Sequence, residues 1–235
     1  MNNTPGGANA ATDEVGRGRF IVYEGIDGSG TTTQAALLAN YLRKKGLRVY
    51  ETAEPTRGPF GSVIRQVLEG RLGLEEHALA AAFAADRYDH LYSADRGILA
   101  QLRAGTWVVC DRYVLSSVVY QAASGLPSEW IHQLNRYVVP PDLTVFVDTP
   151  VDESLARISS RTSFSDRYER KAVLSSAVIR YRESTHSADV AGRLVVVNGS
   201  GPMDPVFERS LDLITKSLAL EVPPAGVRPN EGTAI

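Results

Sequence analysis

A glycine-rich segment near the N-terminus combines residue types and spacing suited to binding phosphate. Residues 25–33 read Gly-Ile-Asp-Gly-Ser-Gly-Thr-Thr-Thr, between an apolar run and a segment of helical periodicity. Glycines let backbone N–H groups converge on phosphate oxygens, and the N-terminus of the following helix adds partial positive charge. A hydroxyl at Thr32 is suited to hold Mg²⁺. The alternative, a tight turn without a ligand, is disfavoured because glycine spacing and element order both match a nucleotide site. We predict that this site uses Asp27, Gly28, Ser29, Gly30, Thr31, Thr32 and Thr33.

Thr31 departs from the phosphate-loop pattern, which places Lys between the last Gly and the Ser/Thr. Lys44 and Lys45 cannot replace it, because they lie near the far end of the helix, about 20 Å away at about 1.5 Å per residue. A charge-assisted hydrogen bond to phosphate is worth roughly 1.5–3 kcal/mol. Either another cation reaches the phosphates, or the protein is a slow enzyme, or it only binds nucleotide. The candidate cations are Arg57, Arg161 and Arg167.

Arg87 lies at the centre of an apolar stripe with helical spacing. A guanidinium on a core face requires a partner, which is either an internal acid or the polar edge of a ligand. Asp86 and Asp89 are too close in sequence to face it, which favours a ligand. Phe83, one turn earlier, is placed to stack on a flat ring; the alternative is a structural salt bridge beside a core aromatic. We expect one helical stripe of Leu79, Phe83, Arg87, Leu91, Ala94, Ile98 and Leu102.

An acid and a cation, Asp111 and Arg112, end a buried apolar run. Asp111 is suited to serve Mg²⁺ through water, and Arg112 to clamp a phosphate. The next helix carries two i,i+4 pairs of hydrogen-bonding side chains. Alone, such a helix is more often a solvent-facing surface, but beside the other motifs we interpret it as lining a ligand site. The pairs are Ser116 with Tyr120 and Ser117 with Gln121.

Two arginines, Arg157 and Arg161, lie at i,i+4 in a helix expected over residues 150–158. A short hydroxyl-rich segment follows, and another helix opens at Arg167 and runs to about Ser184. Such a segment is suited to close over phosphates and deliver Arg to the transferring group. We predict a lid at about residues 159–167; the alternative is an ordinary helix–loop–helix with solvated arginines.

Five short apolar, largely β-branched runs alternate with segments of helical period, which predicts an α/β fold with a parallel sheet covered on both faces. Ligands of such sheets bind beyond the carboxyl ends of the strands, where the motifs above lie. We expect a tail at residues 1–18, one domain at 19–220 and a second tail at 221–235. The expected strands are residues 20–24, 48–52, 107–111, 143–148 and 194–197.

Composition bounds the partners and the compartment. The chain has 235 residues, 27 acidic and 25 basic, and its net charge of −2 argues against a basic protein that coats nucleic acid or lipid. The single cysteine, Cys110, excludes an internal disulfide and fits the cytoplasm. No apolar run approaches the roughly 18 residues of a membrane span, so we expect no membrane partner.

These motifs together resemble the thymidylate kinase family of P-loop nucleoside monophosphate kinases, from about residue 19 to 218. The resemblance rests on Glu24-Gly-Ile-Asp-Gly-Ser-Gly30, Glu54-Pro-Thr-Arg57, Phe83-Ala-Ala-Asp-Arg87 and Asp111-Arg-Tyr113 with the polar helix that follows. It implies a three-layer P-loop kinase fold and transfer of the ATP γ-phosphoryl group to dTMP with Mg²⁺, giving dTDP and ADP. It also implies a homodimer.

The resemblance implies a role for each site residue. Phe83 would stack on thymine and Arg87 would bond its carbonyl edge, bordered by Ser116, Ser117, Tyr120 and Gln121. Asp27 would hold the 3′-hydroxyl and Tyr168 would lie against the sugar. Pro55, Arg57 and Arg112 would serve the acceptor, with Arg57 and Arg112 on its phosphate, and residues 198–205 would border adenine. Gly28 in the loop is typical of members whose catalytic arginine lies in the lid. The expected groups are Arg161, Arg167, Asp111 and Arg112 for catalysis, Thr32 and Asp111 for metal, and Arg157 with the phosphate loop for ATP.

Two other functions stay open at this point. One is a catalytically silent nucleotide-binding module, which Thr31 favours. The other is a kinase for a different nucleotide or small acceptor. The retention of Arg57 and Arg112 beside Asp111 favours an active enzyme, because a chain without catalysis would have little need of an acceptor site.

Overall fold

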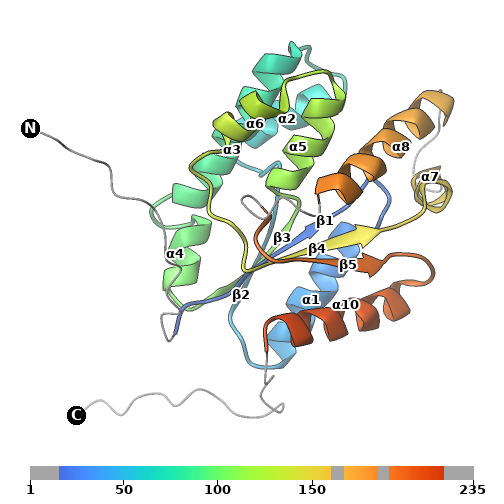
Figure 1. Cartoon of the computed structure of the whole chain (residues 1–235). Helices are drawn as coiled ribbons and strands as arrows, with labels where there is room; N and C mark the ends of the chain where they lie inside the picture. Colours follow the sequence, from blue (N-terminus) through green and yellow to red (C-terminus); the bar gives the residue numbers. More distant parts are fainter. Residues whose placement is uncertain (1–15, 160–166, 185–190, 220–235) are drawn as a thin grey trace, which may run out of the picture.

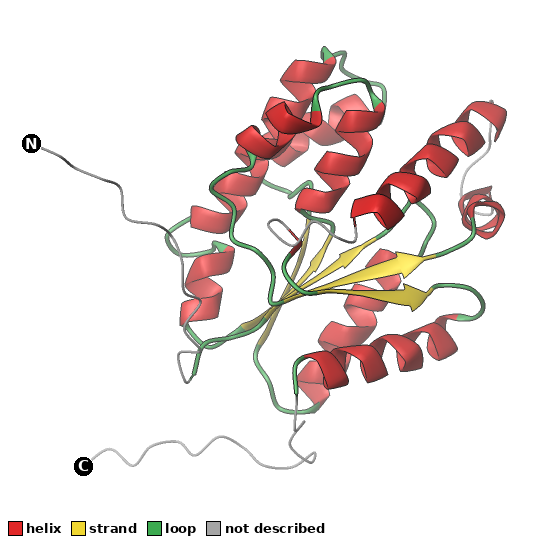
Figure 2. Ribbon diagram, in the orientation of Figure 1, coloured by secondary structure: helices red, strands yellow, loops and turns green. Residues whose placement is uncertain are grey.

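Five parallel strands form the middle layer of the protein in the computed structural model, which describes residues 16–159, 167–184 and 191–219 (Figures 1 and 2). The strand order is β2-β3-β1-β4-β5, with β1 at the centre. The expected α/β fold and parallel sheet are confirmed, with β2 and β5 each ending one residue later than expected. The strands are β1 (Phe20–Glu24), β2 (Val49–Ala53), β3 (Trp107–Asp111), β4 (Leu143–Asp148) and β5 (Leu194–Asn198).

Helices cover both faces of the sheet because successive strand residues point to opposite sides. Ile21 and Tyr23 of β1 pack against α1 (Thr31–Lys44) and α10 (Met203–Ser217). Phe20 and Val22 face the opposite layer, visible above the sheet in Figure 1. That layer contains α3 (Glu76–Tyr92), α4 (Ile98–Arg103), α5 (Val114–Ala123), α7 (Val151–Ser159) and α8 (Arg167–Glu183), with α2 (Pro59–Leu68) on α3 and α6 (Ser128–Leu134) on α5.

The expected stripe from Leu79 to Leu102 is not one helix. α3 ends at Tyr92 and α4 begins at Ile98, so the prediction of a continuous helix is wrong, and Ala94 is exposed. The turn between the two helices requires glycine at position 97, because a Cβ there would lie 2.5 Å from the Ser93 carbonyl oxygen. The chain turns tightly at this glycine, and the apolar pattern resumes on a second helix.

The folded region begins before residue 19. Arg17 forms an ion pair with Asp142 at 3.3 Å, and the Gly18 N–H donates to the Leu102 carbonyl at 2.9 Å. Gly18 is buried against Thr106, whose carbonyl oxygen leaves no room for a Cβ. These two residues therefore belong to the packed domain. Residues 1–15 of the first expected tail and all of the second, residues 221–235, lie outside the described residues.

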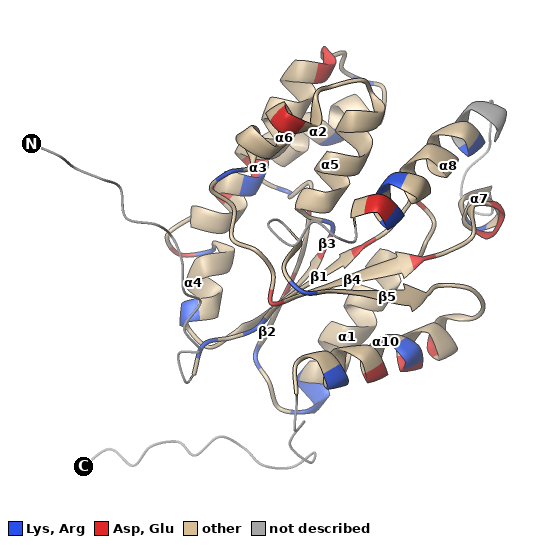
Figure 3. Ribbon diagram, in the orientation of Figure 1, with Lys and Arg blue, Asp and Glu red and all other residues tan. Residues whose placement is uncertain are grey.

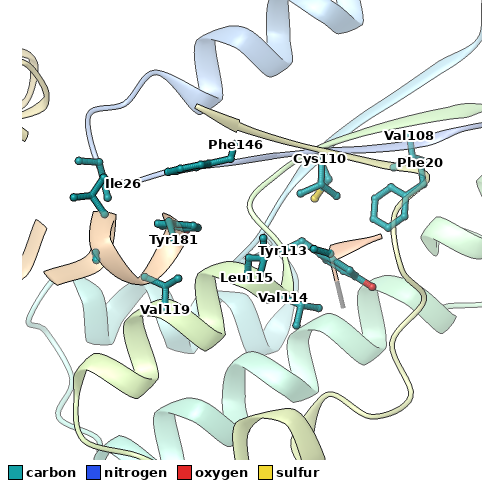
Figure 4. Packing of buried hydrophobic residues seen from close by; sticks show 14 of the residues in the cluster. Phe20, Ile26, Val108, Cys110, Tyr113, Val114, Leu115, Val119, Phe146 and Tyr181 are labelled. Atoms are coloured by element: carbon teal, nitrogen blue, oxygen red, sulfur yellow. The ribbon is translucent and has the colours of Figure 1, made fainter. Parts of the chain in front are cut away.

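Aromatic pairs join the sheet to α8 and to the segment that follows β3. Phe146 of β4 stacks on Tyr181 of α8, with ring centroids 5.1 Å apart and an interplanar angle of 16° (Figure 4). Phe20 meets Tyr113 edge to face at 5.2 Å. The Cys110 thiol is buried between these pairs. Among the described helices, none is long and apolar enough to cross a membrane.

Candidate nucleotide and acceptor site

A cavity of about 1100 Å³ lies beyond the carboxyl ends of the strands. Figure 3 shows acidic residues, in red, at ends of strands. β1 ends at Glu24 and β4 ends at Asp148. The cavity collects residues from the phosphate loop, from α3, α5 and α7, and from the turn between β5 and α10. The predicted site residues that line it are Asp27, Gly28, Ser29, Gly30, Thr31, Thr32, Thr33, Pro55, Phe83, Arg87, Arg112, Ser116, Ser117, Tyr120, Gln121 and Arg157.

The phosphate loop joins β1 to α1 in a conformation that requires glycine. Gly28 and Gly30 have φ angles of 79° and 99°. A Cβ on Gly28 would also lie 2.5 Å from the Ser154 carbonyl oxygen of α7. The first helical hydrogen bond runs from Gln34 N–H to Gly30 O. The N–H groups at the start of α1 therefore have no helical partner and project from its N-terminus, as an anion site requires.

Thr32 and Asp111 meet at the start of α1. The Thr32 hydroxyl donates to Asp111 Oδ2, while the buried Oδ1 has no hydrogen-bond partner within the described residues. Hydroxyl and carboxylate oxygens are ligands that Mg²⁺ accepts, usually with water and nucleotide phosphates. The described part of the chain contains no group of three acidic, His or Cys side chains that would hold a metal alone. The pair therefore fits Mg²⁺ that arrives with a nucleotide.

Arg112 lies between the phosphate loop and α5. Its φ of 73° is in the left-handed region, which is uncommon for a residue other than Gly. Nη2 donates to Asp27 Oδ1 at 3.0 Å, and Nη1 donates to Tyr181 Oη at 3.1 Å and to the Gly25 carbonyl. The guanidinium lines the cavity beside Tyr120. This position suits the binding of a phosphate that enters between the loop and α5.

A buried carboxylate, Glu24, holds Tyr113, Ser116 and Tyr181 together beside Arg112. The sequence motif contains Glu24, but its residue type alone assigned it no role. Glu24 is fully buried and accepts hydrogen bonds from Tyr113 N–H at 2.8 Å, from Ser116 Oγ at 2.6 Å and from Tyr181 Oη at 3.0 Å. Burial raises the pKa of Glu24, and the charge of Arg112 lowers it in part. A carboxylate at the end of an apolar strand was the available signal for Glu24. Tyr181 had none, because its contacts depend on how α8 docks.

The second buried cluster surrounds Arg87, and it corrects the sequence-based expectation. Arg87 is 1% exposed and has an internal acid as its partner: Nε donates to Glu54 Oε2 at 2.8 Å. Asn135 and Ser117 accept from Nη1 and Nη2 at 2.5 and 3.0 Å. The expectation that no internal acid faces Arg87 is wrong, because the acid comes from a segment 33 residues earlier and not from the neighbours of Arg87 in sequence. Binding of a ligand by Arg87 stays a prediction. Arg87 nevertheless lines the cavity, and the second N–H of Nη1 has no partner among the described residues.

Phe83 and Gln121 complete this end of the cavity. Phe83 is half-buried on α3, one turn before Arg87. Gln121 on α5 is 5% exposed, yet neither its amide oxygen nor its amide nitrogen has a hydrogen-bond partner in the described structure. Buried amides are normally paired, because desolvation without a hydrogen bond is costly. A flat ring with both a donor and an acceptor on its edge would satisfy this amide.

Of the remaining predicted residues, Arg157 lines the cavity, Arg57 does not, and three have side chains outside the described residues. Arg157 donates to Ser29 O, to Gly199 O and to Glu153 at 3.0, 3.0 and 2.6 Å, so it joins the phosphate loop to the turn after β5. Arg57 is exposed and does not line the cavity. Arg161 lies outside the described residues. Arg167 and Tyr168 open α8, but their side chains lie outside the described part of the structure.

Comparison with known proteins identifies the family. The family model for thymidylate kinase matches residues 23–209. A probable thymidylate kinase of Pyrococcus abyssi is 37% identical over 209 residues, covering 86% of this chain and 98% of the relative. A thymidylate kinase of Desulfotalea psychrophila is 40% identical over 158 residues, covering 67% and 77% of the two chains. The resemblance and the three-layer P-loop kinase fold inferred from the motifs are thereby confirmed, and this chain belongs to the thymidylate kinase family.

Proposed function

We propose that this protein transfers the γ-phosphoryl group of ATP to dTMP in the presence of Mg²⁺, giving dTDP and ADP for dTTP synthesis. Its membership of the thymidylate kinase family supports this reaction. The observation that carries the proposal is one continuous cavity that joins the phosphate loop at Gly28 to a half-polar slot at Phe83 and Gln121. Donor and acceptor nucleotides would meet in this cavity, as direct phosphoryl transfer requires.

The acceptor base would occupy the slot between α3 and α5. Phe83 offers a face for stacking. The Gln121 amide offers one donor and one acceptor group, which match a carbonyl and the N3–H of thymine. Arg87 offers its remaining Nη1 hydrogen to the other carbonyl, held in place by Glu54. Ser117 and Tyr120 border the same slot.

The acceptor phosphate would bind Arg112, and the 3′-hydroxyl would bind Asp27. These two side chains form an ion pair at 3.0 Å, with Asp27 largely exposed. We keep Arg57 as a second phosphate ligand, which requires it to turn from its exposed position towards the cavity. For Arg161, Arg167 and Tyr168 we retain the roles that the resemblance implies, transition-state charge for the two arginines and contact with the sugar for Tyr168.

ATP would bind the phosphate loop, with Arg157 and the turn after β5 on its adenine side. Thr32 and Asp111 would hold Mg²⁺ together with the nucleotide. When bound, Mg²⁺ neutralises charge on the phosphate oxygens during transfer. The residues of the chain fix the geometry around it: the N-terminus of α1 orients the phosphates, and the loop glycines bring the backbone close to them.

The assembly and the compartment are also proposals. Exposed apolar side chains on α2, Phe60 at 48%, Val63 at 38% and Leu68 at 61%, support a homodimer formed through this helix. Sedimentation equilibrium tests it: the native chain should give twice the monomer mass, and Phe60→Glu should lower that mass towards the monomer. The buried free thiol of Cys110 supports a cytoplasmic location.

A coupled ADP-release assay with an acceptor panel tests the reaction. We expect turnover with Mg-ATP and dTMP, and rates at least about tenfold lower with dCMP and dGMP, whose ring edges present different donor patterns. Equal rates with another monophosphate would assign a different acceptor. ATP binding without turnover on any acceptor would identify a silent nucleotide-binding module and refute the kinase.

A further inference from the structure

Tyr181 of α8 places its hydroxyl next to Arg112, behind the wall of the cavity. The side chain is 1% exposed, and its ring stacks on Phe146 and meets Tyr120 edge to face, with ring centroids 6.4 Å apart. Figure 4 shows the ring between Phe146 of the sheet and α5. The aromatic contacts fix the ring, so the position of the hydroxyl is determined by packing.

Three polar groups converge on this hydroxyl. Arg112 Nη1 lies 3.1 Å from Tyr181 Oη, Ser116 Oγ 2.9 Å and Glu24 Oε2 3.0 Å. Arginine has only donors and an ionised carboxylate has only acceptors. The arrangement that satisfies both has the Tyr181 hydroxyl accepting from Arg112 and donating to Glu24. The hydroxyl therefore links a buried anion to the guanidinium at the cavity wall.

This link determines where Arg112 points. Nη1 is directed inward, towards Tyr181 and the Gly25 carbonyl, and Nη2 is directed to Asp27 at the cavity. Without the Tyr181 hydroxyl, Nη1 would lose one inward acceptor and Glu24 would lose one of its donors. The guanidinium would then have fewer fixed contacts to keep Nη2 facing the cavity.

We infer that Tyr181 is a positioning residue for the acceptor phosphate, acting through Arg112. The inference rests on the proposed function, in which Arg112 binds the phosphate of dTMP. It extends that function to a residue outside the cavity wall whose hydroxyl orients the phosphate-binding group.

Tyr181→Phe tests the inference, because it removes only the hydroxyl and keeps the ring contacts. The matched control is Tyr23→Phe, which removes another fully buried hydroxyl, bonded to Ser210 at 2.8 Å on the opposite face of the sheet. Isothermal titration of each variant measures the Kd of dTMP, thymidine and ATP. Thymidine lacks the phosphate, so it reports the base pocket without Arg112.

We expect Tyr181→Phe to raise the Kd of dTMP about tenfold, the effect of one misplaced charge-assisted contact, and to leave the Kd of thymidine and ATP unchanged. Tyr23→Phe should change none of the three. In an Arg112→Ala background, Tyr181→Phe should have no further effect on dTMP.

Equal losses for dTMP and thymidine would give Tyr181 a general structural role and overturn the inference. Unchanged dTMP affinity in Tyr181→Phe, with wild type preferring dTMP over thymidine, would overturn it and leave the proposed function intact. Wild type that binds dTMP no better than thymidine would contradict the acceptor site itself.

Discussion

Gln121→Met separates the stability of the free protein from its binding of the acceptor. Gln121 is buried in α5 with both amide atoms unpaired within the described structure. Methionine is about as long, favours helix, and has no amide to desolvate. Leaving a buried polar group unpaired costs about 1–3 kcal/mol. The substitution should therefore stabilise the ligand-free protein by up to this amount.

The same amide is expected to pair with thymine, so the substitution should weaken dTMP. Two neutral hydrogen bonds at about 0.5–1.5 kcal/mol each correspond to a rise in Kd of about 5- to 140-fold. For a chain of this size, each kcal/mol of stabilisation raises Tm by about 2–4 °C. The two effects have opposite signs, which a general packing defect cannot produce.

Differential scanning calorimetry of the ligand-free protein and titration with dTMP measure the two effects. Gln133→Met is the control, because Gln133 is exposed and its side chain bonds, among the described residues, only Glu129, one turn away on α6. It should move neither Tm nor Kd beyond experimental error. A lower Tm in Gln121→Met together with unchanged dTMP affinity would refute the reasoning, since the amide would then be structural.

Three further substitutions test other parts of the site. Thr31→Lys should lower the Kd of ATP about tenfold or more. The Kd of AMP should not change, because AMP lacks the β- and γ-phosphates that a lysine would contact. Equal effects on both nucleotides would contradict the view that a phosphate contact is missing at Thr31. Asp111→Asn should reduce kcat about 10²–10³-fold and raise the Mg²⁺ concentration that gives the half-maximal rate. Asp148→Asn, the control, should do neither. A magnesium titration of initial rates measures both effects. Glu54→Gln should lower the free energy of unfolding, measured in urea, by about 3–5 kcal/mol, because it leaves Arg87 buried without a counter-charge. A loss below about 1 kcal/mol would show that the two side chains are not coupled.

The local parts of the fold could be predicted from the sequence. β1, β3 and β4 begin and end where their apolar runs do, and the phosphate loop is marked by Gly28 and Gly30, whose left-handed backbone few other residues adopt. These signals lie within a few residues of the structure that they predict. The resemblance to the thymidylate kinase family rests on several such motifs in one order, and the family model that matches residues 23–209 confirms it.

Contacts between distant segments could not be predicted in the same way. The partner of Arg87 is Glu54, 33 residues earlier and on a different element. Tyr181 reaches Glu24 across 157 residues. A single sequence specifies the residue type at each position, but the pairing depends on how the helices dock on the sheet. Glu54 as the partner of Arg87, and Tyr181 as the partner of Glu24, were therefore missed. Each is a buried polar group whose partner comes from another element.

The helix break at Gly97 was missed for a related reason. A stripe of apolar residues can continue across two packed helices, so periodicity alone does not show where one ends. The glycine was the signal, and its close approach to Ser93 gives its physical role. Polar residues around it, Asp95 and Arg96, are exposed in the turn.

Transfer of labelled phosphate from ATP to dTMP in a single turnover is the most direct test of the central claim. Enzyme in excess over ATP labelled at the γ-position is mixed with dTMP and Mg²⁺, and the products are separated after quenching. We expect the label to appear in dTDP at the same rate as ADP forms. Label released as inorganic phosphate, or ATP bound and left intact, would contradict it.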